Sequence, residues 1–431
     1  MKPRSLVPLL LLVPLLVVPV TSSPAEAAPG RPTCQGKRAT IVGDGTRKVL
    51  RGTRRADVIV TRGSSLVLPG RGDDRVCVTG SAGRTAQVVD LAGDDRVVVQ
   101  MRRAATVYAQ LGQGRDYYRG GIGSDRVTGN KYGGNGDHEG DDDAYDDIAT
   151  GAGDDSVVTG GPRGVGDRID LGPGSDTLEL RATRFDGGRL VGGAGFDRLM
   201  VEPDLGLDTA VDVPAGTITS DGTPVVAHED FETYDLRLAV SGRLRFTGSD
   251  AGEQLNAGGV SRLEAAMGGG GDSVFVGWAQ SPPSIDVDGG AGTDALTVAG
   301  EDLLIDVPGG TASTTGTLPD VRFAGFDTYL GVGARVTIQG GDTADKLSAY
   351  GCDVVVRGGG GDDRLEAVEG FFDEDFDCDG ITGEVHGDGG DDVLIGNRAD
   401  NLLDGGEGTD SADGAAGNDT CLAEARVRCE S

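Results

Sequence analysis

Aspartate ends a glycine-rich turn of the form Gly-Gly-x-Gly-x-Asp at many places in the chain, and an apolar residue usually follows two positions later. Four turns fit this form in full and end at Asp125, Asp197, Asp294 and Asp410. Glycine adopts positive φ readily and lets two backbones approach closely, so such a turn can direct several carbonyl oxygens inward. With the carboxylate, these oxygens form the hard donor set that Ca²⁺ prefers. The turn therefore predicts calcium binding.

Looser copies of the same turn place an aspartate at its sixth position elsewhere in the chain. A single aspartate of this kind can also cap a turn or be solvated, so the repetition favours a role as ligand. The looser copies supply these further candidate calcium ligands: Asp57, Asp74, Asp95, Asp116, Asp155, Asp167, Asp176, Asp272, Asp345, Asp363, Asp392 and Asp419.

The spacing of the aspartates predicts how the turns stack. Two runs advance by 21 residues and the C-terminal run advances by nine: Asp74, Asp95 and Asp116; Asp155, Asp176 and Asp197; then Asp392, Asn401, Asp410 and Asp419. A 21-residue step fits one solenoid coil of nine plus twelve residues. The short apolar triplets between turns would form parallel strands whose alternate side chains fill a narrow core. We therefore expect an all-β solenoid in which neighbouring coils share each ion.

Composition favours a thin, repetitive core and a cationic partner. The 431 residues include 76 glycines, and aromatic residues make up 4%, whereas one large core would use more aromatic side chains. The 70 acidic residues outnumber the 39 basic ones and give a formal net charge of −31. This charge would repel a phosphate backbone. We expect no nucleic-acid partner, and calcium ions are the natural partners.

The repeated turn resembles the RTX, or haemolysin-type, calcium-binding repeats. The resemblance covers most of residues 43–421 and implies that family's fold, a right-handed parallel β-roll or β-helix with Ca²⁺ between glycine-rich turns. One half-site is expected to be lost where Lys48 takes the aspartate position, and Glu253 takes it before Gln254. The cysteine-containing ends also look like those of secreted actinobacterial calcium-binding repeat proteins. The resemblance is strongest over residues 52–60, 70–78, 120–128, 192–200, 289–297 and 387–421.

Residues 1–27 have the features of a secretory signal peptide. Lys2 and Arg4 precede an apolar stretch, and Ala25-Glu26-Ala27 fits cleavage before Ala28. That stretch is short for a membrane span and no later segment is apolar enough, so we expect an extracellular protein with no membrane span. After export the six cysteines are expected to form disulfides. They allow 15 pairings, of which nearest-neighbour pairing joins Cys34 to Cys77, Cys352 to Cys378 and Cys421 to Cys429.

Two longer segments look like copies of one unit. Residues 192–277 and 289–370 share the full glycine turn, an Asp-Val-Pro step, an aromatic-acid-Thr-Tyr step and a closing four-glycine turn. Between these marks the calcium pattern fades, so we expect longer coils without metal, with their Phe and Tyr residues in the core. The expected units are the signal peptide 1–27, an N-terminal solenoid with calcium repeats 28–191, the first copy 192–288, the second copy 289–370, an acidic calcium-loop-like insertion 371–386, and C-terminal nonapeptide repeats with a disulfide cap 387–431.

Two acidic stretches interrupt the repeat. Residues 137–147 form either an additional cation site or a solvated loop. In the other stretch, Asp375, Asp377 and Asp379 precede a glycine and resemble the first half of an EF-hand loop, in which oxygens at positions one, three and five bind calcium. Position twelve is His386 rather than glutamate. These three aspartates are further candidate calcium ligands.

Catalytic motifs are missing from the sequence. It contains no His-Glu-x-x-His, no Gly-x-Ser-x-Gly and no Gly-x-x-x-x-Gly-Lys-Ser/Thr segment. We therefore expect a secreted calcium-binding repeat protein that is not an enzyme and whose folding is coupled to ions between stacked turns. One alternative is a cell-surface adhesin or matrix protein with structural calcium, whose partner would be a cell surface or a polysaccharide. The other is a secreted polysaccharide lyase.

Overall fold

The structure is a computed structural model in which every regular element is a β-strand. No described residue is helical, so the described chain has no helix that could cross a membrane. The described residues are 31–46, 48–80, 85–90, 92–101, 104–129, 144–160, 166–181, 187–202, 208–236, 243–260, 262–277, 284–314, 321–368, 378 and 380–430.

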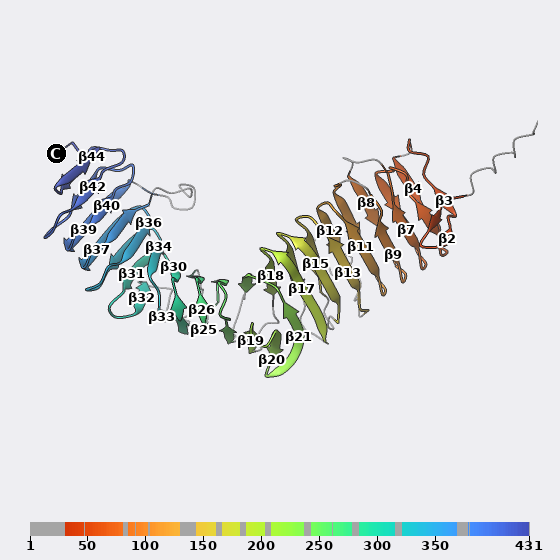
Figure 1. The fold of residues 1–431 in the computed structure, drawn as a ribbon, viewed down its shortest axis with the longest axis horizontal. Helices are drawn as coiled ribbons and strands as arrows, with labels where there is room; N and C mark the ends of the chain where they lie inside the picture. Colours follow the sequence, from red (N-terminus) through yellow and green to blue (C-terminus); the bar gives the residue numbers. More distant parts are fainter. Residues whose placement is uncertain are drawn as a thin grey trace, which may run out of the picture.

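Successive coils stack side by side into two long sheets (Figure 1). In the first sheet, Val76 lies in register with Val97 of the next coil. In the second sheet, Val88 lies in register with Ala109. Except for two insertions in the first sheet, neighbouring strands run parallel. The prediction of an all-β, parallel β-roll solenoid is confirmed.

The first sheet contains β3 (Ile41–Val42), β5 (Val58–Val60), β7 (Arg75–Val78), β9 (Arg96–Val99), β11 (Tyr117–Gly121), β13 (Asp147–Gly151), β15 (Arg168–Gly174), β17 (Gly188–Gly195), β19 (Thr209–Asp212), β20 (Thr217–Ser220), β21 (Thr223–Glu229), β23 (Leu244–Thr247), β25 (Arg262–Ala266), β28 (Ser284–Asp288), β31 (Asp302–Asp306), β32 (Thr311–Thr314), β33 (Val321–Ala324), β35 (Arg335–Gln339), β37 (Asp353–Gly360), β39 (Thr382–Gly389), β41 (Asn401–Asp404) and β43 (Thr420–Leu422).

The second sheet contains β4 (Val49–Arg51), β6 (Leu66–Leu68), β8 (Ala86–Val89), β10 (Val107–Gln110), β12 (Asp125–Thr128), β14 (Ser156–Thr159), β16 (Thr177–Arg181), β18 (Arg198–Glu202), β22 (Thr233–Leu236), β24 (Gln254–Gly258), β27 (Ser273–Gly277), β30 (Ala295–Ala299), β34 (Thr328–Val332), β36 (Lys346–Tyr350), β38 (Arg364–Ala367), β40 (Val393–Ile395), β42 (Ser411–Asp413) and β44 (Ala425–Val427). Two small pairs complete the set: β1 (Thr33–Cys34) with β2 (Lys37–Arg38), and β26 (Gly269–Gly270) with β29 (Ala291–Gly292).

Alternate side chains of each strand point into the narrow space between the two sheets. In β25, Leu263 and Ala265 are buried while the residues on either side of each are exposed. Neighbouring strands lie about 4.8 Å apart, so the inward side chains form continuous apolar rows along the solenoid. One row of the first sheet comprises Ile59, Val76, Val97, Tyr118, Ile148, Ile169 and Leu190.

Two three-stranded meanders are inserted in the first sheet. In the first meander β20 pairs antiparallel with β19 on one side and β21 on the other. In the second, β32 pairs antiparallel with β31 and β33. In each meander the outer strands pair in parallel with the neighbouring coils, so the sheet continues across the insertion. Both lie toward the lower edge of the solenoid in Figure 1. They fall within the two segments interpreted as copies of one unit, and that duplication stays a prediction.

The aromatic residues of the two shared aromatic-acid-Thr-Tyr steps belong to the core, as predicted. Phe231, Tyr234, Phe326 and Tyr329 are all buried. The ring of Tyr234 meets that of Phe246 edge-on, with 5.2 Å between centroids, a favourable arrangement for aromatic pairs. These large side chains fill the wider coils next to the meanders.

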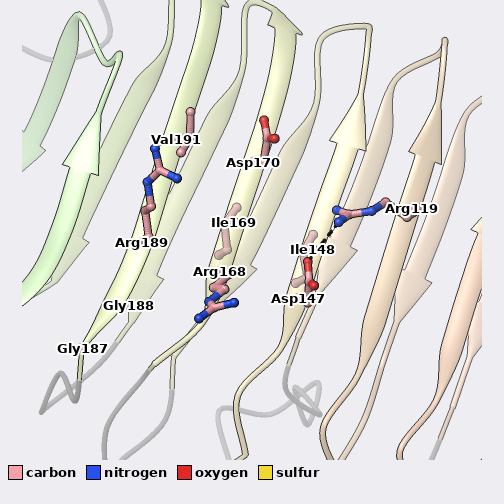
Figure 2. A pocket seen from close by; sticks show the side chains of 10 residues that line it. All are labelled: Arg119, Asp147, Ile148, Arg168, Ile169, Asp170, Gly187, Gly188, Arg189 and Val191. Atoms are coloured by element: carbon pink, nitrogen blue, oxygen red, sulfur yellow. Dashed lines mark ion pairs between the residues drawn. The ribbon is translucent and has the colours of Figure 1, made fainter.

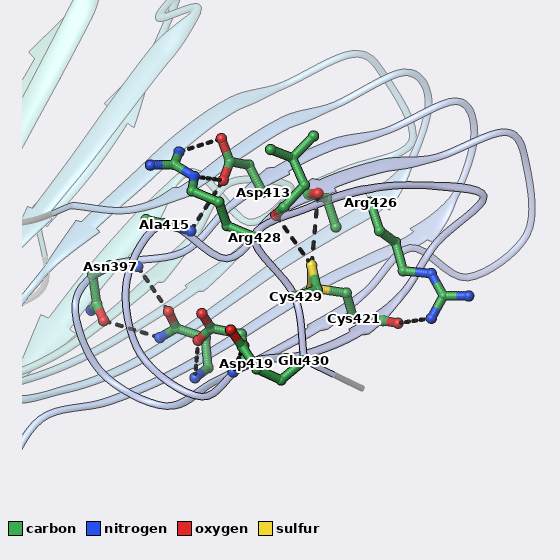
Figure 3. The surroundings of a disulfide bond; sticks show 12 residues. Asn397, Asp413, Ala415, Asp419, Cys421, Arg426, Arg428, Cys429 and Glu430 are labelled. Carbon is green, nitrogen blue, oxygen red and sulfur yellow. Dashed lines mark hydrogen bonds and ion pairs between the residues drawn. A yellow bond between two sulfur atoms is a disulfide. The ribbon is translucent and has the colours of Figure 1, made fainter.

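Three disulfides join the cysteines in the nearest-neighbour pattern. Cys34 of β1 bonds to Cys77 of β7, and the other two bridges are Cys352–Cys378 and Cys421–Cys429. The last of these closes the C-terminal end (Figure 3). Beside it, Arg428 pairs with Asp413 through its Nε at 2.7 Å. Bridges at both ends therefore fasten the terminal coils to the solenoid.

Candidate metal-binding site

The acidic turn residues are sorted onto two edges of the solenoid. We define the first edge as the side where the chain enters a strand of the first sheet, and the second edge as the side where it enters a strand of the second sheet. Asp74 precedes β7 on the first edge, and Asp125 begins β12 on the second. Because the strands are in register, equivalent residues of successive coils lie above one another.

The first column runs along the first edge and consists of carboxylates linked by backbone hydrogen bonds. The backbone N–H of each member donates to Oδ1 of the next, at distances of 2.6–2.9 Å. These bonds fix the inward orientation of each carboxylate. Its members are Asp57, Asp74, Asp95, Asp116, Asp146 and Asp167.

The second column runs along the second edge and is longer. Most of its steps are the same N–H to carboxylate bond, at 2.6–2.9 Å, and strand register supplies the remaining two. Its members are Asp125, Asp155, Asp176, Asp197, Glu232, Glu253, Asp272, Asp294, Asp327, Asp345, Asp363, Asp392, Asp410 and Glu424.

Among the described residues, the second edge carries no acidic column before Asp125. In the preceding coils the equivalent positions are Val107, Ala86, Ser65 and Lys48, going back along the solenoid. The coil in which Lys48 was predicted to replace an aspartate is thus one of four consecutive coils that have no carboxylate at this position of the second edge. At the C-terminal end the first edge becomes polar again, where Asn401 donates to Asp419 at 2.8 Å and Asp419 donates to Glu430 at 2.7 Å.

The second oxygen of many column carboxylates, and of Asp419 at the C-terminal end of the first edge, is buried without a hydrogen-bond partner among the described residues. An unpaired buried carboxylate oxygen is costly, and a hard cation is the partner it lacks. Several such oxygens stacked beside backbone carbonyls suit Ca²⁺, which takes six to eight oxygen ligands. The residues present therefore fit calcium. The atoms are Oδ1 of Asp125 and Oδ2 of Asp74, Asp95, Asp155, Asp176, Asp197, Asp272, Asp294, Asp363, Asp392 and Asp419.

Burial raises the pKa of several column carboxyls, and neighbouring carboxylates add to the effect. The pKa of Asp74, Asp125 and Asp176 rises to about 7. Near neutral pH the columns therefore favour either a bound proton or a bound cation. The same causes raise the pKa to about 6 for Asp95, Asp272 and Asp363.

Three carboxylates come especially close on the first edge. Ligand oxygens of Asp74, Asp90 and Asp95 all lie within 4.8 Å of one another, and all three residues are buried. Asp90 stands at the first position of the turn that ends at Asp95, where the full repeat has glycine. This part of the column concentrates more negative charge than the repeat alone would give.

Glycines keep the turns close enough to stack their carbonyls. At Gly292 φ is +149°, and a Cβ there would lie 1.5 Å from the carbonyl oxygen of Gly270 in the preceding coil. A Cβ on Gly195 would likewise lie 1.6 Å from the carbonyl oxygen of Gly174. No side chain fits between these backbones, so the fourth position of the turn requires glycine.

A second set of aspartates lies outside the columns and caps the turns. These residues are exposed and directly precede a column member. The Oδ1 of Asp73 accepts from the N–H of Asp94, at 3.1 Å, and that of Asp154 accepts from Ser175, at 3.0 Å. Such residues match the turn-capping role, which separates them from the buried carboxylates one position later.

All the predicted turn aspartates that the structure describes lie in a column except Asp419, which lies at the C-terminal end of the first edge beside Asn401. Asp57, Asp74, Asp95, Asp116 and Asp167 are on the first edge with Asp419, and the others are on the second edge. The EF-hand-like candidates Asp375, Asp377 and Asp379 lie outside the described residues, as does the proposed signal peptide.

The interpretation of residues 137–147 as an insertion is wrong at its C-terminal end. Asp146 belongs to the first column, and Asp147 begins β13, where it pairs with Arg119 at 3.3 Å. The physical reason is register, because Asp146 lies 21 residues before Asp167 and Ile148 fills the apolar position two places later. The rest of that stretch up to residue 143 lies outside the described residues.

Sequence reasoning also missed acidic residues in the supposedly metal-free segments. Glu232 and Asp327 accept the N–H of Asp197 and Asp294, at 2.7 and 2.9 Å. Each is followed two positions later by a buried tyrosine, the same offset as the apolar residue of the repeat. That offset was a signal available in the sequence.

Comparison with protein families supports the calcium interpretation. The model of the RTX calcium-binding nonapeptide repeat matches the chain in four copies, over residues 111–131, 339–370 and 386–421. No curated protein matches the chain. The matched segments contain members of both columns and the glycine turns that hold them. The predicted repeat family is thus confirmed on these segments: the chain carries RTX calcium-binding nonapeptide repeats.

Proposed function

We propose that the protein is an extracellular, non-enzymatic calcium-binding solenoid whose folding is coupled to ions held along the two acidic columns. The observation that carries this proposal is the set of buried column oxygens without a hydrogen-bond partner among the described residues. A fold that buries so many unpaired carboxylate oxygens needs cations to stabilise it.

Charge repulsion and ion binding act in opposite directions on this fold. With a formal net charge of −31, the ion-free solenoid is destabilised by self-repulsion. A bound ion adds RT ln(1 + [L]/Kd) to stability, about 2.7 kcal/mol when free calcium is 100-fold above Kd. Sites in neighbouring coils share carboxylates, so their contributions are coupled rather than additive.

The extracellular location rests on the cysteines and the N-terminal segment. The described chain pairs all its cysteines in disulfides, which persist in oxidising compartments. Residues 1–27 have the composition of a cleavable export signal. Calcium sites of extracellular modules work at about 10⁻⁴–10⁻³ M, so weak sites would suffice there.

A calcium titration of the chain from Ala28 to Ser431 tests the proposal. After calcium is removed at pH 8, far-UV circular dichroism should show a coil-like spectrum that becomes β-rich as calcium is added. Magnesium should not replace calcium, because it demands near-ideal octahedral geometry and dehydrates reluctantly. A β-rich spectrum that is unaffected by chelation would overturn the proposal, and the aspartates would then serve as turn residues.

A further inference from the structure

One turn on the first edge begins with a carboxylate where the full repeat has glycine. The turn that ends at Asp95 begins with Asp90, whereas the turns of the two neighbouring coils begin with Pro69 and Leu111. Among the described residues that stand five positions before a column aspartate, Asp90 is the one with a carboxylate. The repeat itself therefore does not account for this residue.

A side chain at the first position of the turn projects toward the column carboxylate of the same turn. A Cβ on Gly120 would lie 2.1 Å from Oδ2 of Asp125. On Gly387 it would lie 2.2 Å from Oδ2 of Asp392. Leu111 has this position in the coil after Asp90, and its side chain is buried in the core. The position thus directs its side chain inward, onto the column.

The Asp90 carboxylate lies close to those of two column members. Ligand oxygens of Asp74, Asp90 and Asp95 are all within 4.8 Å of one another. Because Ca²⁺ binds oxygens at about 2.3–2.6 Å, two oxygens on one ion can lie at most roughly 5 Å apart. All three carboxylates can therefore reach a single ion.

This cluster is buried, and the protein satisfies its carboxylates only in part. Asp74 and Asp95 are each 1% exposed, and Asp90 is 3% exposed. Oδ1 of Asp95 accepts the N–H of Asp74 at 2.6 Å, but Oδ2 of Asp74 and Oδ2 of Asp95 have no hydrogen-bond partner among the described residues. Burial raises the pKa of Asp95 to about 6, although hydrogen bonds with the Asp74 backbone and the Asp90 side chain lower it. Once these carboxyls are ionised, the cluster needs a cation.

A carboxylate on the outer face of the same sheet is balanced in a different way. Figure 2 shows Asp147 turned toward Arg119, whose Nη2 lies 3.3 Å from Oδ1 of Asp147. There a basic side chain supplies the positive charge, and solvent screens the pair. In the buried cluster, Oδ2 of Asp74 and Oδ2 of Asp95 lack such a donor among the described residues. The balancing charge therefore has to come from an ion in solution.

Both coils that form the cluster are firmly held. Strands β7 and β9, which follow Asp74 and Asp95, pair in parallel over four residues. Cys77 of β7 is also bridged to Cys34. Ligand charge and site rigidity set the affinity of a calcium site. This site has three carboxylates on two fastened coils, whereas an ordinary step of either column has two.

We propose that Asp90 is a third carboxylate ligand of the Ca²⁺ held between the turns that end at Asp74 and Asp95, and that this ion is the most tightly bound in the described chain. Asp90 can act in this way only if the columns hold calcium, so the proposal rests on the proposed function. In a repeat protein each coil contacts only its neighbours, and structure spreads from one formed coil to the next. The N-terminal coils should therefore load and fold at calcium concentrations that leave the C-terminal repeats empty.

Equilibrium dialysis with radioactive calcium at pH 8 measures the tight step in the chain from Ala28 to Ser431. The unmodified protein should show one tight binding step before the remaining sites fill. In Asp90→Asn the dissociation constant of that step should rise at least about tenfold, a loss that even the outer partners of metal ligands cause. The matched control Asp94→Asn removes an exposed carboxylate from the same turn and keeps an acceptor for the N–H of Arg115. It should change the constant less than about twofold.

Hydrogen exchange followed by mass spectrometry locates the tight step in the fold. At a calcium concentration that fills only this step, peptides containing β7 and β9 should be protected, while those containing β40 and β42 exchange freely. Asp90→Leu copies Leu111 of the next coil and should lose this protection. Far-UV circular dichroism at saturating calcium should be the same for all the proteins, which separates loss of a ligand from loss of the fold.

Three results would count against Asp90 as a ligand of the tightest site. They are a single class of calcium sites in the unmodified protein, equal binding curves for Asp90→Asn and Asp94→Asn, or protection that begins in the C-terminal coils. A chain that folds with calcium yet gives any of these results keeps the proposed function and loses only the role of Asp90. A chain that binds no calcium loses both.

Discussion

Lowering the pH should refold the calcium-free protein. Burial and neighbouring carboxylates raise the pKa of Asp74, Asp125 and Asp176 from the ordinary value of 3.8 to about 7. Between these two pH values the folded state binds more protons than the unfolded state, so the stability of the ion-free fold falls as pH rises from about 4 to 7. Once the pH is above about 7, these carboxyls are ionised in both states and cause no further loss of folding stability.

The size of this loss is comparable to the whole stability of a domain. One pKa unit corresponds to about 1.4 kcal/mol, so each of these three carboxyls contributes a loss of roughly 4 kcal/mol. This figure is an upper value for each group, because solvent screens charges near the surface and neighbouring carboxyls interact rather than add. Even so, a loss of this order is a large share of typical unfolding free energies of about 5–15 kcal/mol. Asp95 and Asp272, whose pKa rises to about 6, act in the same direction. The calcium-free fold should therefore be lost near neutral pH.

The assay is far-UV circular dichroism of calcium-stripped protein from pH 8 to pH 5, with the calcium-loaded protein as control. The stripped protein should gain β-structure as the pH falls through about 7 to 6, while the loaded protein should keep a β-rich spectrum over that range. A stripped protein that is equally folded at pH 8 and pH 5, or more folded at pH 8, would refute the reasoning.

Further variants separate ion binding, stacking and covalent closure. Asp176→Asn keeps the acceptor for the N–H of Asp155 but removes the buried charge, so urea unfolding at pH 6.5 should show a gain of about 1–2 kcal/mol without calcium and a loss with calcium. Gly292→Ala should cost about 2–4 kcal/mol by thermal unfolding with calcium, because its Cβ would lie 1.5 Å from a carbonyl oxygen, whereas Gly389→Ala, whose Cβ would lie 3.8 Å from its nearest neighbour, should change stability by less than about 0.5 kcal/mol. Cys34→Ser opens the bridge that spans 43 residues and should cost about 4 kcal/mol, which denaturant unfolding would measure.

The sequence was sufficient to predict the solenoid and most column residues. Glycine at fixed offsets and an apolar residue two positions after each aspartate determine both the turn and the inward face of the following strand, so Asp74 and Val76 could be placed together. The sequence left the disulfide pairing open, and the structure has the nearest-neighbour pattern because a solenoid brings close in space what is close in sequence.

Other features depend on contacts that the repeat does not encode. The sorting of aspartates onto two edges requires knowledge of which sheet each strand joins. The meander that includes β20 is held by antiparallel pairing, for which short polar strands give little signal. The alignment of residues across coils is equally hidden, since Arg96 and Arg168 are far apart in sequence and align only through three successive strand pairings.

The coil length explains where each edge needs ions. In the C-terminal coils the column steps are 18 residues, so each half-coil has nine and both edges can carry the repeat, as at Asp410 and Asp419. In the 21-residue coils only one half-coil keeps nine residues. The first column stops at Asp167, because the next coil has Gly188 in register, and the meanders follow on the same sheet. Hydrogen-bonded hairpins and aromatic packing there stabilise the coils that the first edge no longer ties together with carboxylates and cations.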